Sequence, residues 1–322
     1  MQPRERVFAA IRHEEADRVP LNIWAYWNRV VDEATAKYGS MERFLDHLHV
    51  DMFTAFPAKG FMVAAEPVDS LDAALDMPTN DPDDPSIYHP VKEAVRRHKE
   101  GAGRAVFCQT EGVFETACNC LGIQNAMVEF ALNKERFATL LNRIARFSAR
   151  FVENCLDLGV DVPHISDDWG QNGRLLISPR DWWQYIYPAE KIIVDAAKRR
   201  GAFVSLHSDG YIHDVLDGVV QMGIDVVHPL QESAGMDQRL VKRQFGGRLA
   251  LYGGLDIRDS LPSSPEEELR SSIQAIMRDL KPGGGFIFCT SHTVQDDTPL
   301  ERVEKAYAWA YESSFYGGHQ PV

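Results

Sequence analysis

Short apolar runs rich in β-branched and aromatic residues recur along this 322-residue chain, and stretches of helical periodicity separate them. Eight of these runs are candidate strands, near residues 20, 51, 104, 160, 202, 225, 249 and 285. Strands that alternate with helices pair in parallel, because each crossover helix returns the chain to the same edge of the sheet. The alternation predicts an α/β fold, a single (β/α)8 TIM barrel formed by residues 1–322, with a doubly wound open sheet as the alternative.

Three predicted helix starts share one local signature. A hydroxyl residue (Ser178, Ser264 or Thr298) precedes a proline, and an acidic residue follows three positions after the hydroxyl. The hydroxyl suits the N-cap, the proline suits the first helical position, and the acid favours the positive end of the helix dipole. We therefore expect each hydroxyl to cap the helix that follows it.

The composition excludes several classes of partner. The 34 Lys and Arg residues against 47 Asp and Glu give a net charge of −13, and no basic run is present, which argues against nucleic acid as a partner.

With no signal peptide and no apolar segment long enough to span a bilayer, we expect a cytoplasmic protein without membrane contact, as a monomer or homodimer. The five cysteines are an odd number, which favours reduced thiols, and the Cys118-x-Cys120 pair lacks a second pair to complete a zinc site.

Polar and aromatic residues follow many of the predicted strands. In a parallel barrel the reactive groups lie at the carboxyl ends of the strands, so these residues are candidates for substrate binding. They are Trp24, Tyr26, Glu111, Gln171, Gln231 and Asp256. Trp24 and Tyr26, with the neighbouring Trp27, suit the floor of a pocket for a flat ligand, although aromatic residues near a first strand are also common in a core.

A histidine and an aspartate two positions apart follow the strand predicted near residue 202. In extended chain, residues i and i+2 project to the same side, with Cα atoms roughly 6–7 Å apart, so His207 and Asp209 can both reach one cation. His292, after the last strand, is the candidate third ligand. Two imidazoles and one carboxylate leave a coordination position open, as in catalytic zinc sites. An ordinary Asp-Gly turn is the alternative interpretation, and the βα alternation disfavours an iron oxygenase with the same ligand types.

Asp167 and Asp168 are adjacent carboxylates at the end of another predicted strand. Repulsion between such groups raises one pKa, which suits acid/base catalysis, and we therefore predict both as catalytic. Adjacent residues in a strand face opposite sides, so the alternative is that one of them only caps a loop.

Five stretches of the chain, taken together and in order, resemble the uroporphyrinogen decarboxylase superfamily. They are PRERVFAAIRHEEADRVPL, SDDWGQNGRLLISPRDWWQYIYP, LHSDGYIHDVLDGVVQMGIDVVHPLQ, YGGLDIRDSL and GGGFIFCTSHTVQDDTPLERV. The resemblance implies a (β/α)8 barrel with its pocket at the carboxyl ends of the strands.

Departures from the pattern favour one branch of that superfamily. True decarboxylases carry an arginine-rich R-Q-A-G-R loop, where this chain has WAYWNRV with Arg29 alone. The corrinoid-dependent methyltransferases hold zinc with an H-x-C pair and a later cysteine. Here His207-x-Asp209 and His292 stand at those positions, and both departures replace a thiolate by a harder ligand.

The resemblance implies a metal-dependent methyltransferase that moves a methyl group between a small methoxy or thiol compound and a corrinoid. The cofactor implied is Zn²⁺ or another divalent ion. No cobalamin-binding D-x-H-x-x-G sequence occurs in the chain, so we expect a separate protein to carry the corrinoid. The alternatives are decarboxylation of a tetrapyrrole and a non-catalytic barrel that binds a small molecule.

Overall fold

The computed structural model describes residues 1–26 and 28–317, so Trp27 lies outside the described residues. The chain divides into two units, each assembled from separate segments of sequence. The first unit comprises Met1–Phe53, His98–Ala105 and Val226–Val322, and the second comprises Thr54–Arg97 and Val106–Asp225. Each is described on its own, and the expected single domain stays a prediction.

The second unit contains parallel strands whose carboxyl ends lie level with one another. The strands are β2 (Ala105–Glu111), β3 (Val162–Ser166) and β6 (Ser205–His207). The register pairs Glu111 with Ser166 and Ser166 with His207, so these residues end the strands side by side. The strands are almost continuously buried, as expected for a parallel sheet covered on both faces.

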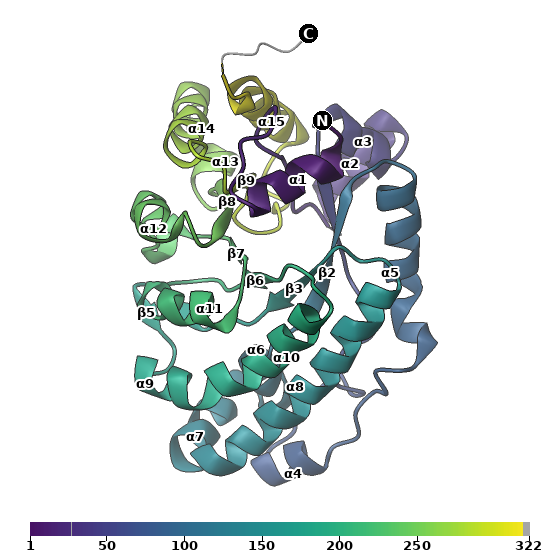
Figure 1. Cartoon of the computed structure of the whole chain (residues 1–322), viewed down its shortest axis with the longest axis vertical. Helices are drawn as coiled ribbons and strands as arrows, with labels where there is room; N and C mark the ends of the chain where they lie inside the picture. The colour runs from purple at the N-terminus through teal and green to yellow at the C-terminus, as the bar shows by residue number, and fades with distance from the viewer. Residues whose placement is uncertain (27, 318–322) are drawn as a thin grey trace. The chain divides into compact units, whose positions relative to one another are not determined.

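Helices and one hairpin complete the second unit. The helices are α4 (Leu71–Asp76), α5 (His89–Ala94), α6 (Val113–Leu121), α7 (Ile123–Leu132), α8 (Lys134–Asp157), α9 (Pro179–Asp181), α10 (Tyr187–Arg199) and α11 (Leu216–Met222). The long helices α8 and α10 pack side by side (Figure 1). The hairpin of β4 (Gly170–Gln171) and β5 (Arg174–Leu175) was not predicted, because each strand has only two residues and no apolar run marks it.

The first unit has the same parallel arrangement. Its strands are β7 (Val226–His228), β8 (Ala250–Leu255) and β9 (Phe286–Thr290), and the pairings of β7 with β8 and of β8 with β9 are parallel. Its helices are α1 (Pro3–Ile11), α2 (Arg29–Tyr38), α3 (Met41–His47), α12 (Gln238–Phe245), α13 (Ser260–Ser263), α14 (Glu266–Leu280) and α15 (Leu300–Ser314). Helices α14 and α15 pack against each other.

The predicted strand near residue 20 is extended but only partly paired. Leu21 forms parallel bridges with Val50 and Phe288, and the amide of Asn22 donates to the carbonyl of Phe288 at 2.8 Å. Pro20 has no N–H to donate, which limits the ladder. The other seven predicted strands are formed, counting β1 (Met52–Ala55), so the α/β fold with parallel strands is confirmed. The closed eight-stranded barrel stays a prediction.

One of the three predicted helix caps is confirmed. The Ser178 hydroxyl accepts the amide of Asp181 at 3.0 Å, and Pro179 begins the helix. At α14 and α15 the hydroxyl prediction was wrong, because the prolines themselves, Pro265 and Pro299, are the N-caps with extended backbones. Ser264 and Thr298 are therefore one residue too early to reach the first free amides of the helix.

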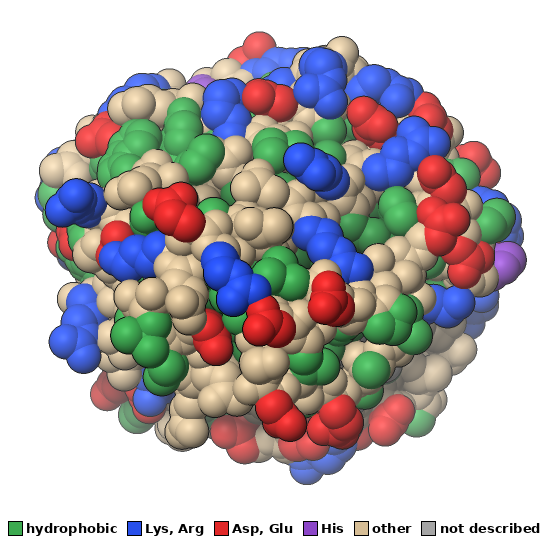
Figure 2. Space-filling model, turned by 90° about the horizontal axis from the view of Figure 1, so that it is seen from below, with side chains coloured by type: hydrophobic (Ala, Val, Ile, Leu, Met, Phe, Trp, Pro, Cys, Tyr) green, Lys and Arg blue, Asp and Glu red, His purple; other side chains and the backbone are tan. Residues whose placement is uncertain are grey.

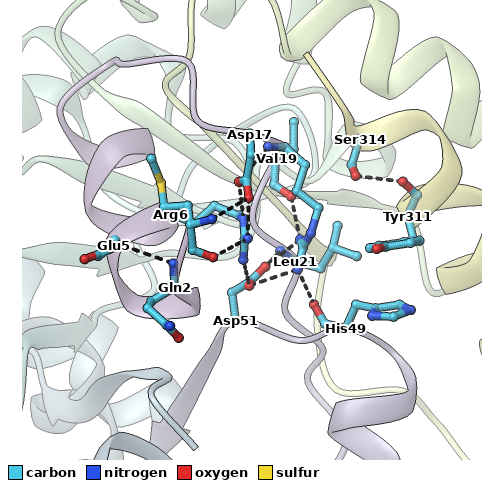
Figure 3. Close-up of polar contacts among 12 residues, drawn as sticks. Gln2, Glu5, Arg6, Asp17, Val19, Leu21, His49, Asp51, Tyr311 and Ser314 are labelled. Atoms are coloured by element: carbon cyan, nitrogen blue, oxygen red, sulfur yellow. Dashed lines mark hydrogen bonds and ion pairs between the residues drawn. The ribbon is translucent and has the colours of Figure 1, made fainter. Parts of the chain in front are cut away.

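Buried charges tie the amino-terminal segment to the residues before β1 (Figure 3). Asp51 is buried and accepts hydrogen bonds from the guanidinium groups of Arg6 (2.5 Å) and Arg18 (2.7 and 3.0 Å), and from the amide of Leu21 (2.8 Å). Arg6 also donates to both carboxylate oxygens of Asp17 at 2.6 and 2.7 Å. The network fixes the extended segment that follows Asp17 within the first unit.

The surface carries both signs of charge despite the acidic total. Figure 2 shows basic and acidic side chains interspersed over the face in view. Within the described residues, no helix combines the length and the apolar character needed to cross a bilayer.

Candidate functional site

The loop after β6 is held against the hairpin that follows β3. Gly210 has a positive φ of 80°, and a Cβ there would lie 2.4 Å from the backbone carbon of Gly170. The amide of Tyr211 donates to the carbonyl of Gln171 at 3.0 Å, and the amide of Asp209 donates to the Asp168 carboxylate at 2.7 Å. Backbone contact and hydrogen bonds therefore fix Asp209 next to Asp168.

His207 ends β6 between these two carboxylates. Its Nε2 lies 3.8 Å from Oδ1 of Asp209 and 3.9 Å from Oδ1 of Asp168. Donors that share a tetrahedral zinc ion at ~2.0–2.2 Å lie roughly 3.3–3.6 Å apart. The distance from His207 to Asp209 exceeds these separations by only a few tenths of an ångström, so this pair of donors fits a divalent ion, and Asp168 lies beside it. Burial raises the pKa of Asp209 to about 6, the charge of Asp168 adds to this rise, and His207 opposes it.

Asp167 has a different environment from Asp168. It is fully buried and caps the amino terminus of α6, where it accepts the amides of Phe114 (3.1 Å) and Glu115 (2.6 Å) and the indole N–H of Trp169 (2.6 Å). Burial raises its pKa to about 6. These donors engage both of its carboxylate oxygens, so Asp167 caps α6, whereas Asp168 lines a cavity, and the catalytic roles predicted for both aspartates stay predictions.

Glu190, which the sequence did not single out, reinforces that cap from α10. Its carboxylate accepts the amide of Val113 at 3.1 Å. Burial and the neighbouring charge of Asp167 raise the pKa of Glu190 well above its ordinary value. Two buried carboxyl groups therefore meet the first turn of α6, and the pair retains a proton more readily than exposed acids do.

Glu115, in the first turn of α6, belongs to the site although it was not among the predicted site residues. It accepts a hydrogen bond from the Ser166 hydroxyl at 3.1 Å. Burial, together with the charges of Asp168 and Asp167, raises the pKa of Glu115 to about 8. The sequence feature that could have indicated Glu115 is its position: it lies four residues after Glu111, just beyond the end of a predicted strand.

A cavity of about 510 Å³ lies beside these acids in the second unit. Glu115 and Asp168 are its charged lining residues, and Cys118 and Asn119 are its other polar ones. The apolar lining comes from Met62, Ala65, Pro67, Ile123 and Leu176. Burial raises the pKa of Cys118 to about 12, so its thiol is neutral and acts as part of the wall. The volume is within the range of ~300–1,000 Å³ typical of small-molecule sites.

His164 is a second histidine that the sequence did not indicate. It lies on β3 beside β6, is fully buried, and its Nδ1 is 2.8 Å from the Ser205 hydroxyl. Burial, with the nearby His207, holds the pKa of His164 well below its ordinary value, so the ring is neutral. Its ring centroid is 6.0 Å from that of His207.

Three of the predicted residues in the first unit, Trp24, Tyr26 and His292, have aromatic rings that lie close together. The indole N–H of Trp24 donates to the Tyr252 hydroxyl at 2.8 Å, and its ring stacks on His228 with centroids 4.6 Å apart. The ring centroid of His292 is 5.9 Å from that of Trp24, and the ring centroid of Tyr26 is 6.2 Å from that of Trp24. His292, the predicted third metal ligand, therefore lies in an aromatic cluster of the first unit, and its role as a ligand stays a prediction.

The four remaining predicted binding residues have local structural contacts. Glu111 accepts the amide of Phe61 at 2.6 Å, and Asp256 accepts three amides, those of residues 258, 259 and 260. Gln171 belongs to the hairpin and lines a second cavity of about 450 Å³ in the second unit. The carbonyl of Gln231 accepts the amide of Ala234 at 3.1 Å. Their substrate-binding roles stay predictions.

Residues 53–312 match the family described as Uroporphyrinogen decarboxylase (URO-D). The chain belongs to the uroporphyrinogen decarboxylase family. The resemblance inferred from the five sequence stretches is thereby confirmed.

Individual relatives of this family member are distant. Uroporphyrinogen decarboxylase from Carboxydothermus hydrogenoformans is 24% identical over 184 residues, which are 56% of this chain and 49% of the relative. The enzyme of the same name from Coxiella burnetii is 24% identical over 172 residues, or 52% of this chain and 45% of the relative. The chain thus spans about half the length of the curated relatives it matches.

A solved structure resembles the chain over nearly its full length. It is a methyltransferase from Methanosarcina mazei, with a TM-score of 0.72 and 17% identity, and the match covers 97% of this chain and 99% of that chain. At this identity the likeness establishes the fold.

Proposed function

We propose that this family member is a metal-dependent methyltransferase that moves a methyl group between a small methoxy or thiol compound and a corrinoid carried by a partner protein. The observation that carries the proposal is the His207 imidazole, which lies 3.8 and 3.9 Å from two carboxylates, one of which lines the cavity. The likeness in fold to a methyltransferase supports it. The setting we propose is a (β/α)8 barrel with its site at the carboxyl ends of the strands.

The ligands that we propose for Zn²⁺ or another divalent ion are His207, Asp209 and His292. The hydrogen bond from the amide of Asp209 to Asp168 supports this assignment, because it fixes the loop that presents the carboxylate. Nitrogen and oxygen donors form a harder set than thiolates, which favours an oxygen-bearing substrate. When bound, the ion supplies Lewis acidity toward an ether oxygen or lowers the pKa of a thiol.

The protein's own groups orient the substrate. Asp168 lines the cavity and lies 3.9 Å from His207, and Glu115 lines the same cavity from the first turn of α6. The apolar side chains around them exclude water from the reacting atoms. Cap residues Asp167 and Glu190 hold α6, and through it Glu115, in place.

Decarboxylation of a tetrapyrrole is the alternative, because the curated relatives are uroporphyrinogen decarboxylases. Their substrate bears many carboxylates, which basic side chains recognise best. The described lining of the 510 Å³ cavity contains Glu115 and Asp168 but no Lys or Arg. This charge disfavours the decarboxylase substrate, and a non-catalytic small-molecule barrel is the remaining alternative.

Elemental analysis tests the proposal. The purified protein, loaded with Zn²⁺ and dialysed, should hold one ion per chain, and His207→Ala, Asp209→Ala and His292→Ala should each lose it. Asp214→Ala is the matched control, because this exposed carboxylate in the same unit accepts a hydrogen bond from the Tyr211 hydroxyl at 3.0 Å, and its loss should leave the metal content unchanged.

The metal content should be measured together with consumption of methylcobalamin in the presence of methoxy compounds or thiols. Both should be lost in the same variants. Full turnover without metal, or decarboxylation of a tetrapyrrole by the metal-free protein, would overturn the proposal.

A further inference from the structure

We propose that residues 63–67 form a flap at the 510 Å³ cavity, which opens to admit a ligand and closes on it. The flap and the cavity both belong to the second unit. The flap controls access to the cavity whatever reaction takes place there, so this inference is independent of the proposed function.

The flap forms part of the cavity wall. Ala65 and Pro67 line the cavity from within the flap, and Met62 lines it directly before the flap begins. Helix α6 and the start of α7 supply Cys118 and Ile123 to the same lining. Because one wall is a loop and another is helical, a movement of the loop changes how open the cavity is.

The chain is firmly held where the flap begins. The Phe61 side chain is buried, and its backbone amide donates to the Glu111 carboxylate at 2.6 Å. The side-chain amide of Asn80 donates to the carbonyls of Gly60 and Met62, both at 2.8 Å. These bonds fix the first end of the flap.

The other end of the flap is attached to α6 and α7. The amide of Val68 donates to the carbonyl of Cys120 at 2.8 Å. A Cβ at Gly122 would lie 3.9 Å from Cγ of Pro67, which is ordinary van der Waals contact. With both ends attached, the five residues between them can move without disturbing the core.

The middle of the flap is only loosely held. All five of its residues are exposed, and Val63 is 57% exposed. No hydrogen bond or ion pair joins residues 63–67 to the rest of the described chain. A segment with exposed backbone and few bonds opens at a low free-energy cost. Four of the five side chains are apolar, and covering them on closure over a ligand would stabilise the closed position.

Cys118 can report the position of the flap, because it is the cysteine among the described lining residues of the cavity. Cys120 lies on the same helix but is fully buried, so its modification reports unfolding of α6 instead. The test is the rate at which N-ethylmaleimide modifies each thiol of the native protein, followed by mass spectrometry of peptides. The high pKa of Cys118 slows this reaction to the same extent in every variant, so the ratio of rates reports access.

Loosening the flap should speed the modification of Cys118. Asn80→Ala removes two hydrogen bonds from the first end and should raise the rate about tenfold. Pro67→Gly changes an exposed residue, frees the backbone at the second end, and should raise the rate about threefold. Cys120 should stay unmodified in both variants. A fluorescein maleimide, which has the same reactive group and a larger body, should gain more than N-ethylmaleimide from each change.

Asn142→Ala is the matched control, because Asn142 on α8 also donates its side-chain amide to a backbone carbonyl, that of Ala138 at 2.7 Å. It should leave the rate at Cys118 unchanged. Equal rates in all three variants, or modification of Cys120 together with Cys118, would overturn the flap. Circular dichroism checks that each variant is folded, and Pro67→Gly decides the outcome if Asn80→Ala does not fold.

Discussion

Asp167 and Asp168 are neighbours in sequence, yet they serve different parts of the molecule. Asp167 is fully buried and accepts two backbone amides at the start of α6 and one indole N–H. Asp168 lines the cavity and bonds the loop that carries Asp209. The backbone alternation at the end of β3 sends one side chain to a helix terminus and the other toward the ligand site.

Substitution of each aspartate by alanine should separate the two roles. Asp167→Ala leaves three buried donors without their acceptor, at ~1–3 kcal/mol each, and should lower the free energy of unfolding by about 3 kcal/mol or more. Asp168→Ala should change stability little but weaken metal retention, because its carboxylate positions Asp209. Urea denaturation and elemental analysis measure the two effects, and equal losses of stability in both variants would contradict the assignment.

At the scale of elements, one hydroxyl cap is made and two are not. Ser178→Ala should lower the free energy of unfolding by about 1 kcal/mol, because the amide of Asp181 loses its acceptor. Ser264 is the matched comparison, since its hydroxyl donates to the carbonyl of Ser260 and does not cap α14. Ser264→Ala should cost less than about 0.5 kcal/mol. A larger loss for Ser264→Ala than for Ser178→Ala in urea denaturation would contradict the cap geometry.

The buried charge network joins α1, the following extended segment and the residues before β1 (Figure 3). Asp51→Asn would leave Arg6 and Arg18 buried without the carboxylate that they share, and should lower the free energy of unfolding by ~3–5 kcal/mol. Glu93→Gln is the control, because Glu93 pairs with Arg96 and Arg97 at the surface, where solvent screens the pair. Thermal denaturation should show a large loss for the first variant and a negligible one for the second, and similar losses would argue against the network's importance.

At the scale of the whole molecule, buried acids in the second unit set an unusual dependence of stability on pH. Burial raises the pKa of Asp167 and of Asp209 to about 6 and that of Glu115 to about 8, whereas unfolded carboxyl groups ionise near pH 4. From about pH 4 to pH 8 the native state therefore binds more protons than the unfolded state. Its stability falls as the pH rises, because the contribution present at low pH is lost through the folded pKa values.

Urea denaturation in the presence of EDTA should therefore give a lower free energy of unfolding at about pH 8 than at about pH 5, by on the order of 1–3 kcal/mol. Glu190→Gln removes one member of the buried pair with Asp167 and should reduce this slope. A stability that increases over the same range would contradict the proton-binding argument. Restoring Zn²⁺ should recover stability at pH 8, because the ion proposed for the site would bind the ionised form of Asp209.

The positions of the strands and the pair His207-x-Asp209 were accessible from sequence, because both depend on short-range order. An apolar run of five or six residues marks a buried strand, and residues two apart in extended chain share a side wherever the strand lies. The proline helix starts were found for the same reason, although their exact N-caps depended on the backbone angles of Pro265 and Pro299.

Only the tertiary structure decided which acids serve the site. The amino terminus of α6 lies about fifty residues from Asp167 in sequence, and its free amides claim that carboxylate. The same packing places Glu115 beside Ser166 and in the cavity with Asp168, a grouping that no local spacing encodes. Spacing along one strand selected His207 and Asp209, whereas burial and long-range hydrogen bonds determined which carboxyl groups remain available to a ligand.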